Sequence, residues 1–183
     1  MKAALFLAEG FETVEALGTV DILRRAGIET DTVSVTDSVQ VLSSQKINVS
    51  ADTVISKIQF DSYDILILPG GMPGTINLEK CKVLTEAVIR FNSQGKLLAA
   101  ICAAPTVLAH TGCLTGKKAS VYPGREKDLE DGGAKVSFAS VSEDGNVITA
   151  RGMGVTNDFA LAIVARCAGR EISDNIRKGI IAG

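Results

Sequence analysis

Residues 64–71 have the sequence Asp-Ile-Leu-Ile-Leu-Pro-Gly-Gly, in which four apolar residues in a row are followed at once by a proline and two glycines. An unbroken apolar run is typical of a strand that is buried on both faces of a parallel sheet. Lys96–Ile101 and Ala3–Ala8 have the same character. Runs of this kind alternate with helical patterns along the whole chain. The sequence therefore predicts an α/β fold with a mainly parallel sheet between helices.

Periodicity and turn residues predict the remaining elements. Further strands are expected at Glu29–Thr36, Lys118–Tyr122, Phe138–Val141 and Val147–Ala150, the last two joined through Glu143-Asp144-Gly145-Asn146, with a hairpin-like excursion at Val39–Val49. Helices are expected at Glu12–Ala26, Cys81–Asn92, Ala103–His110, Arg125–Glu130, Val155–Ala168 and Glu171–Ile181. No repeat, low-complexity tract or linker interrupts this order, so residues 1–183 are expected to form one domain.

Composition excludes several classes of function. The 183 residues are 46% hydrophobic and 22% charged, which is ordinary for a globular protein. A net charge of -2 gathers neither nucleic acid nor an anionic membrane, so neither is an expected partner. The apolar run at the start is too short for the core of a signal peptide, and no run approaches the ~18 residues of a membrane helix. Four cysteines without a Cys-x-x-Cys pair, together with a single histidine, predict no disulfide framework, no metal site and a cytoplasmic location.

The most informative chemistry lies in Ala99-Ala100-Ile101-Cys102-Ala103-Ala104-Pro105. An apolar strand runs directly into Cys102, and small residues with a proline then begin a helix. This is the pattern of a strand-to-helix elbow, which lifts a nucleophile out of the sheet. A thiol at a helix N-terminus has a lowered pKa, so we expect the pKa of Cys102 to lie below the usual ~8.5. The alternative is a cysteine that packs as a small buried hydrophobe.

Two other strand ends carry unusual residues. Gly70 and Gly71 leave backbone N–H groups unobstructed, as an oxyanion site requires, although a tight turn that needs positive φ explains them equally well. Glu15 lies among the first apolar turns of its predicted helix, near Val14 and Leu17. If it faces Cys102, burial raises its pKa and allows the neutral acid to donate a hydrogen bond to the thiolate. A glutamate on the helix surface, near the N-terminal dipole, is the alternative.

The remaining candidate residues give weaker evidence of a functional role. His110 is the single histidine, eight residues after Cys102 at the end of the same short helix. That spacing places it roughly 12 Å away along the helix axis, too far to act as the direct base. The other three cysteines have no comparable context, so we interpret each as packed or exposed without chemistry. They are Cys81, Cys113 and Cys167.

The sequence as a whole resembles the ThiJ/PfpI superfamily, and within it the branch of the Parkinsonism-associated protein deglycase and its bacterial homologues. The matching motifs, in one order along the chain, are Ala8–Glu15, Leu68–Gly71, Ala99–Pro105, Arg151–Gly154 and Asp158–Val164. The resemblance implies a flavodoxin-like three-layer α/β sandwich of the class I glutamine amidotransferase type. It also implies a cytoplasmic homodimer, to which the mean hydropathy of +0.24 adds support.

The resemblance implies roles for particular residues. Cys102 corresponds to the nucleophilic, easily oxidised elbow cysteine, and Glu15 to the carboxylic acid that is hydrogen-bonded to it. Backbone N–H groups of Gly71 and Ala103 correspond to the oxyanion site, with Gly70 in the pocket. Where the branch has a histidine beside the cysteine, this chain has Tyr122. A Cys-His dyad is therefore absent, and Tyr122 is expected only to shape the pocket.

Two functions from different classes follow from this resemblance, and a third interpretation is a homodimer whose site is vestigial. The first is a cofactor-free enzyme that acts on reactive carbonyls, either small dicarbonyls or glycated protein side chains. In it the Cys102 thiolate adds to an aldehyde and Glu15 moves a proton between adjacent carbons. The second is an oxidative-stress sensor or chaperone that is signalled by oxidation of Cys102.

Overall fold

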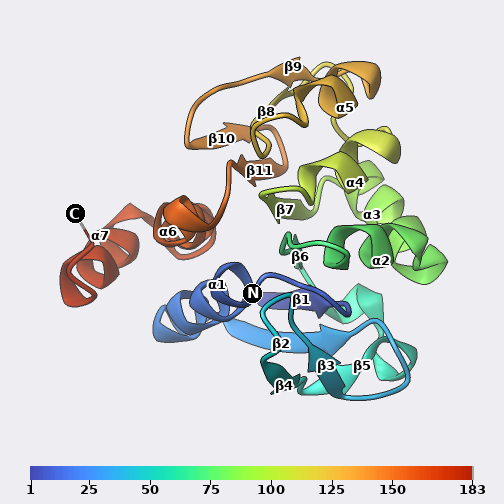
Figure 1. The fold of residues 1–183 in the computed structure, drawn as a ribbon. Helices are drawn as coiled ribbons and strands as arrows, with labels where there is room; N and C mark the ends of the chain where they lie inside the picture. The colour runs from blue at the N-terminus through green and yellow to red at the C-terminus, as the bar shows by residue number, and fades with distance from the viewer. Residues whose placement is uncertain (183) are drawn as a thin grey trace.

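A seven-stranded sheet forms the centre of the computed structural model, which describes residues 1–182 (Figure 1). Its strand order is β10-β11-β7-β6-β1-β2-β5. Every neighbouring pair is parallel except β10 and β11, so the predicted mainly parallel sheet is confirmed. The strands are β1 (Lys2–Leu7), β2 (Glu29–Ser34), β5 (Thr53–Val54), β6 (Ile65–Leu68), β7 (Leu97–Ile101), β10 (Val141–Asp144) and β11 (Val147–Ala150).

Helices cover both faces of the sheet, and each face has its own apolar core. The alternation of side chains along a strand sends Ala4 and Phe6 of β1 into one core, and Ala3, Leu5 and Leu7 into the other. Four helices pack on the first face: α2 (Gly74–Lys80), α3 (Lys82–Ser93), α4 (Pro105–His110) and α5 (Glu126–Asp131). Three pack on the second: α1 (Thr13–Arg25), α6 (Thr156–Ala168) and α7 (Arg170–Gly179). Because helices bury both faces, the central strands read as continuous apolar runs.

The connections reverse direction beside β1. From β1 the chain moves to β2 at one side, whereas β6 and β7 lie at the other side. In an open parallel sheet, such a reversal leaves a crevice outside the carboxyl ends of the strands, where ligands bind. The segments that leave β1, β6 and β7 all begin at this edge. They contain Glu15, Gly70 and Cys102 respectively.

Two small ribbons lie outside the main sheet. The predicted hairpin is confirmed as antiparallel β3 (Gln40–Leu42) and β4 (Asn48–Ser50). The strand expected at 118–122 is reduced to β8 (Lys118–Ala119), which pairs with β9 (Lys135–Val136). The reason is that the next backbone donors are used elsewhere: Ser120 N donates to the Thr149 hydroxyl, and Tyr122 N donates to the Cys102 carbonyl.

One predicted strand is displaced along the chain. The expected strand at 138–141 is wrong, because β10 begins at Val141 and the turn to β11 contains only Gly145 and Asn146. Residues 137–139 are engaged with the β8 segment instead, since Ser137 N donates to Ala119 O and Ser120 Oγ donates to Ala139 O. The sequence did not predict α2, β5 or the short 3-10 turns η1 (Ile55–Lys57), η2 (Phe60–Ser62) and η3 (Met153–Val155). None of the helices within residues 1–182 is long and apolar enough to cross a membrane.

Candidate active site

The elbow at Cys102 has a left-handed backbone, with φ +65°. A residue with a Cβ pays a steric cost of about 1–2 kcal/mol in this conformation, so the surrounding structure must hold it there. Two hydrogen bonds do so: Cys102 N donates to Ala150 O at 2.9 Å, and Cys102 O accepts from Tyr122 N at 2.7 Å. The helix α4 begins at Pro105 rather than at Ala103 as expected. The backbone conformation is that of a strained nucleophile elbow.

Glu15 lies in the first turn of α1 and is completely buried. Its Oε2 accepts a hydrogen bond from Gly70 N at 2.9 Å. The same oxygen and the Cys102 Cβ lie 2.8 and 2.6 Å from the position that a Cβ on Gly70 would take, so the carboxyl lies beside the Cys102 side chain. Its Oε1 has no partner among the described residues. The predicted neighbours Val14 and Leu17 are exposed, because the buried face of α1 is formed instead by Glu15, Ala16, Thr19, Val20, Ile22 and Leu23.

Burial raises the pKa values of both groups. Desolvation is the largest cause for Glu15 and raises its pKa to about 7, while the contact with Cys102 and the Gly70 N–H lower it. Desolvation is also the largest cause for Cys102, and with the charge and hydrogen bond of Glu15 it raises the thiol pKa to about 12. Because the two groups are in contact, they titrate as a pair.

The expected low pKa of Cys102 is therefore wrong. Its physical basis was the dipole of the following helix, but α4 has only six residues and begins three residues beyond the thiol. Hydrogen bonds from the N–H groups of Ala103 and Gly71 lower the thiol pKa, but burial and the adjacent carboxyl outweigh them. The pair retains a proton near neutral pH, and no preformed thiolate is favoured.

Gly70 and Gly71 are explained by close approach. A Cβ on Gly70 would lie 2.6 Å from Cys102 Cβ and 2.8 Å from Glu15 Oε2, so any side chain there would separate the pair. Gly71 has φ +94°, and a Cβ on it would lie 2.4 Å from Glu12 N. The glycines bring the loop after β6 against both Glu15 and Cys102. There the N–H groups of Gly71 and Ala103 act on the Cys102 sulfur and lower the pKa of the thiol.

Tyr122 lies at the rim of the site and is 52% exposed. Its ring is 3.5 Å from the position that a Cβ on Gly152 would take, and that position is 4.0 Å from Cys102 Sγ. The backbone of Tyr122 supports the elbow, as described above, while its ring forms one wall beside the sulfur. The structure thus brings together Cys102, Glu15, Gly70, Gly71, Ala103 and Tyr122.

His110 is placed away from the thiol. Its Nδ1 is 2.5 Å from Glu79 Oε1 of α2, at the far end of α4. Among residues 1–182, no three His, Cys, Asp or Glu side chains form a cluster that could hold a metal ion. The single histidine therefore pairs two helices and does not contact Cys102.

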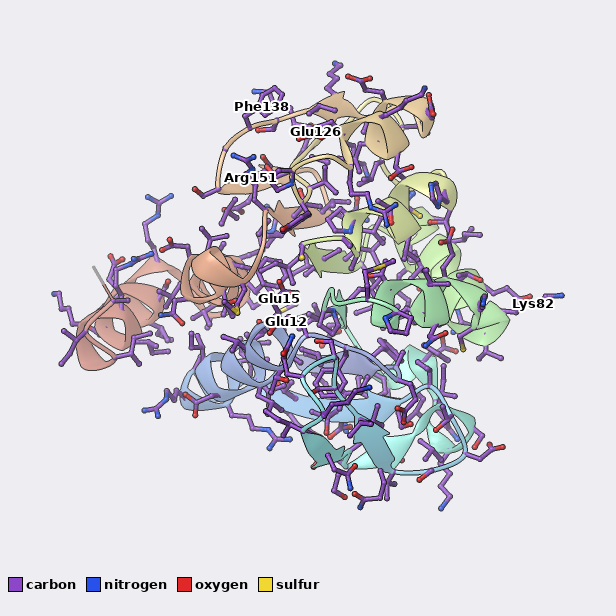
Figure 2. The ribbon with its side chains drawn as sticks, viewed as in Figure 1. Glu12, Glu15, Lys82, Glu126, Phe138 and Arg151 are labelled. Carbon is purple, nitrogen blue, oxygen red and sulfur yellow. The ribbon has the colours of Figure 1, made fainter. Side chains whose placement is uncertain are left out.

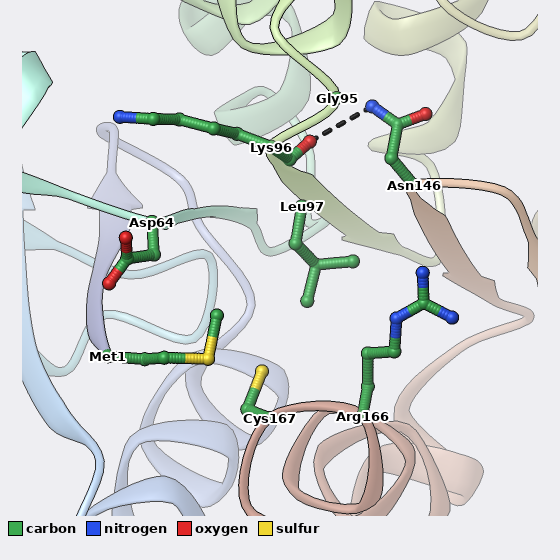
Figure 3. A pocket seen from close by; sticks show the side chains of 8 residues that line it. All are labelled: Met1, Asp64, Gly95, Lys96, Leu97, Asn146, Arg166 and Cys167. Atoms are coloured by element: carbon green, nitrogen blue, oxygen red, sulfur yellow. Dashed lines mark hydrogen bonds between the residues drawn. The ribbon is translucent and has the colours of Figure 1, made fainter.

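A separate cavity of about 270 Å³ lies at the opposite edge of the sheet, before the strands begin (Figure 3). Its lining includes Asp64, Leu97, Arg166 and Cys167. Burial raises the pKa of the Cys167 thiol to about 11 and also raises that of Cys113. Both thiols are therefore protonated at neutral pH, as expected for cysteines that pack.

Glu12 contributes to the site, although its position in the sequence predicted only the start of a helix. It is the N-cap residue of α1, and its Oε2 accepts a hydrogen bond from Glu15 N at 2.7 Å. Figure 2 shows Glu12 and Glu15 together where α1 begins. The signal that could have found it is the capping spacing, an acceptor side chain three residues before the buried acid.

An α/β sheet with an elbow cysteine against a buried glutamate, at the carboxyl edge where the strand order reverses, defines a class of cysteine-centred α/β proteins. The chain belongs to the DJ-1/PfpI family, whose model matches residues 1–166. It is 35% identical to protein dj-1beta of Drosophila melanogaster over 180 residues, which cover 98% of this chain and 96% of the relative.

Further comparisons agree with this assignment. The chain is 33% identical to the Caenorhabditis elegans protein named glutathione-independent glyoxalase DJR-1.2, over 97% of this chain and 95% of that one. The crystal structure of Drosophila melanogaster DJ-1beta superposes with a TM-score of 0.94 at 34% identity, covering 100% of this chain and 98% of that chain. The C103A mutant of the Salmonella typhimurium protein STM1931 gives 0.93 at 34% identity, with the same coverage. These neighbours share the α/β fold described above.

Proposed function

We propose that the protein is a cofactor-free enzyme that converts small dicarbonyl compounds, such as methylglyoxal, to hydroxy acids. The contact between the buried Glu15 carboxyl and the Cys102 thiol carries this proposal, since it pairs a nucleophile with an acid–base group in a site at the sheet edge. The relative named as a glutathione-independent glyoxalase supports the choice of substrate.

The protonation of the pair determines how the first step runs. Above a pH of about 7 the pair has lost one proton, and Glu15 is the group whose pKa lies there. Glu15 takes the thiol proton as the sulfur of Cys102 forms a bond to the aldehyde carbon. The C–O double bond becomes an alkoxide, to which Glu15 returns the proton, and the product is a hemithioacetal. In this proposal the N–H groups of Gly71 and Ala103 stabilise the negative oxygen.

The second step is a proton shift between adjacent carbons. The Glu15 carboxylate removes the proton of the former aldehyde carbon, which gives an enediolate, and delivers it to the neighbouring carbon, while the hydroxyl proton moves from the oxygen of the first carbon to that of the second. The result is a thioester on Cys102, which water hydrolyses to the hydroxy acid and the free thiol. No electrons leave or enter, because one carbon is oxidised as its neighbour is reduced.

Production of lactate from methylglyoxal by the pure protein tests the proposal. Removing a nucleophile or general base typically costs on the order of 10²–10⁴-fold in rate, so Cys102→Ala should abolish turnover and Glu15→Gln should lose most of it. Tyr122→Phe, which deletes only a hydroxyl at the rim, should cost less than about tenfold in kcat/KM. Cys81→Ala is the matched control, because Cys81 is a half-buried cysteine like Cys102 but lies where α2 meets α3. Turnover that survives Cys102→Ala would overturn the proposal.

The same chemistry extends to glycated protein side chains, in which the carbonyl compound is already attached to a thiol or an amine. A time course with a preformed methylglyoxal adduct of a cysteine peptide separates the two substrates. Direct action releases the peptide thiol faster than trapping of free methylglyoxal by excess free thiol does. Equal rates assign the activity to the free dicarbonyl.

A second candidate function is an oxidation sensor or chaperone switched at Cys102. The observation that favours it is the pair of N–H groups directed at the sulfur, which suit the oxygens of a sulfinate. Two molecules of peroxide would each transfer one oxygen to the sulfur and leave as water. Intact mass after peroxide treatment should show two added oxygens in the wild type and none in Cys102→Ala. A wild type that gains none is no such sensor.

A further inference from the structure

We propose that Glu12 is a positioning residue of this site, which acts through Glu15 by fixing the first turn of α1 and placing a negative charge beside the buried carboxyl. The inference rests on the proposed role of Glu15 as the acid–base group. It assigns a task to a side chain that does not contact the sulfur. Two contacts and one electrostatic effect support it.

The first contact is the cap itself. Glu12 has extended backbone angles, φ −84° and ψ 124°, and its Oε2 accepts from Glu15 N at 2.7 Å. Its carbonyl accepts from Ala16 N at 3.2 Å, which closes the first helical turn. Serine, threonine, aspartate and asparagine are the common N-cap residues, and of these only aspartate carries a charge. The cap at this helix therefore orients the residue that carries the buried acid and also brings a charge to it.

The second contact joins Glu12 to the loop after β6. Glu12 N donates to Gly70 O at 2.9 Å, and the Cα of Gly71 packs so closely that a Cβ there would lie 2.4 Å from Glu12 N. The N–H of Gly70 donates a hydrogen bond to Glu15 Oε2, and the N–H of Gly71 lowers the pKa of the Cys102 thiol. One residue thus ties the helix that carries the acid to the loop that supplies both donors.

Besides these two contacts, Glu12 acts on Glu15 electrostatically. The charge of Glu12 adds to burial in raising the pKa of Glu15. A like charge about one helical turn away disfavours the ionised form of a carboxyl. Because the proposed mechanism begins with an ionised Glu15, this charge adds to burial in raising the pH at which the enzyme becomes active. Without this charge, the pKa of Glu15 falls and Glu15 ionises at lower pH.

Variants at position 12 separate the cap from the charge. Glu12→Gln retains an oxygen that accepts from Glu15 N and removes the charge, whereas Glu12→Ala removes both. Glu9→Gln is the matched control, since Glu9 lies in the same segment but its carboxylate accepts from Leu42 N at 3.2 Å, on the β3 ribbon. The measurement is the pH profile of kcat/KM for methylglyoxal.

Glu12→Gln should move the rising limb of that profile to lower pH by about half a pH unit, from the loss of one like charge near the protein surface. Glu12→Ala should move the limb in the same direction and also lower the plateau about tenfold or more, because the acid is no longer held in place. Glu9→Gln should superimpose on the wild type. A Glu12→Gln profile that superimposes on the wild type overturns the inference.

A readout without turnover keeps this test apart from the proposed function. The chemical shift of the Glu15 side-chain carboxyl carbon, followed by NMR from pH 4 to 9, reports its ionisation in a protein with or without dicarbonyl activity. In Glu12→Gln the midpoint should fall, and in Glu9→Gln it should not. An unchanged midpoint in Glu12→Gln refutes the role of Glu12 even if the enzyme is active, whereas a lowered midpoint in an inactive protein supports it and rejects only the proposed reaction.

Discussion

At the scale of single residues, the burial of Glu15 links the stability of the protein to pH. The folded protein holds the proton of Glu15 more tightly than the unfolded chain does, because burial raises the pKa from 4.5 to about 7. The stabilisation is fully present below pH 4.5 and is lost as the pH rises to about 7. A tenfold change in proton affinity corresponds to about 1.4 kcal/mol, so the loss amounts to about 3 kcal/mol.

Urea unfolding of the wild type and of Glu15→Gln measures this loss. Glutamine does not titrate, so the difference in free energy of unfolding between the two proteins isolates the carboxyl from other groups. The wild type should lose stability relative to Glu15→Gln between pH 5 and pH 8. A difference that stays constant over this interval would show that Glu15 ionises in the folded protein as it does in the unfolded chain.

At the scale of elements, the site depends on how closely the loop after β6 approaches the elbow after β7. Gly70→Ala places a Cβ 2.6 Å from Cys102 Cβ, so one of the two segments must shift. Overpacking of this kind costs about 1–3 kcal/mol in free energy of unfolding, and the displacement of the pair should lower kcat/KM at least about 100-fold.

Gly154→Ala is the control for Gly70→Ala. Gly154 lies in η3, near the same edge of the sheet, and a Cβ on it would meet nothing within 4 Å. This variant should leave stability and activity close to those of the wild type. If Gly70→Ala behaves like Gly154→Ala in urea unfolding and in kcat/KM, the close approach has no functional importance.

At the scale of the whole molecule, exposed apolar residues gather where α1 and the segment before α6 lie. Val14 and Leu17 on α1 are 50% and 37% exposed, and Met153 in η3 is 53% exposed. The two elements are neighbours, because Gly18 of α1 approaches Thr156 at the start of α6. We propose that this surface packs against its counterpart in a second copy, which gives the expected homodimer.

Sedimentation of the wild type at micromolar concentration should therefore give twice the chain mass of 19.1 kDa. Leu17→Asp buries a charge in the proposed interface and should give the monomer, with circular dichroism unchanged. Ile89→Asp is matched to it, as Ile89 is a 50% exposed apolar residue on α3, on the other face of the sheet. A wild type that sediments as a monomer contradicts the proposal, and so does a dimer that tolerates Leu17→Asp.

Much of the architecture could be predicted from the sequence, because strands buried on both faces appear as apolar runs that need no knowledge of their neighbours. The run ending at Leu68 and the run ending at Ile101 are of this kind, and the second also indicated the elbow. The displacement of β10 could not be predicted, since the segment around Phe138 bonds to the β8 ribbon, a partner distant in sequence. The buried face of α1 could not be predicted either, because it packs against α6, which is also distant in sequence.

The chemistry of the site was predictable in its residues but not in its electrostatics. Position at a strand end pointed to Cys102, and an acid among apolar residues pointed to Glu15. The direction in which the pKa of Cys102 is shifted depends on burial and on the proximity of Glu15, which are properties of the tertiary structure. A helix-dipole argument from local sequence therefore gave the wrong sign.

The left-handed backbone at Cys102 sets two kinds of selection against each other. Glycine adopts this conformation without the contact between Cβ and a carbonyl oxygen that costs other residues about 1–2 kcal/mol. Selection for heat resistance alone would therefore favour a glycine at position 102, and the elbow thiol would be lost with it. Laboratory evolution that screens for folding without assaying turnover would discard the cysteine, because the residue that makes the site reactive also weakens the scaffold.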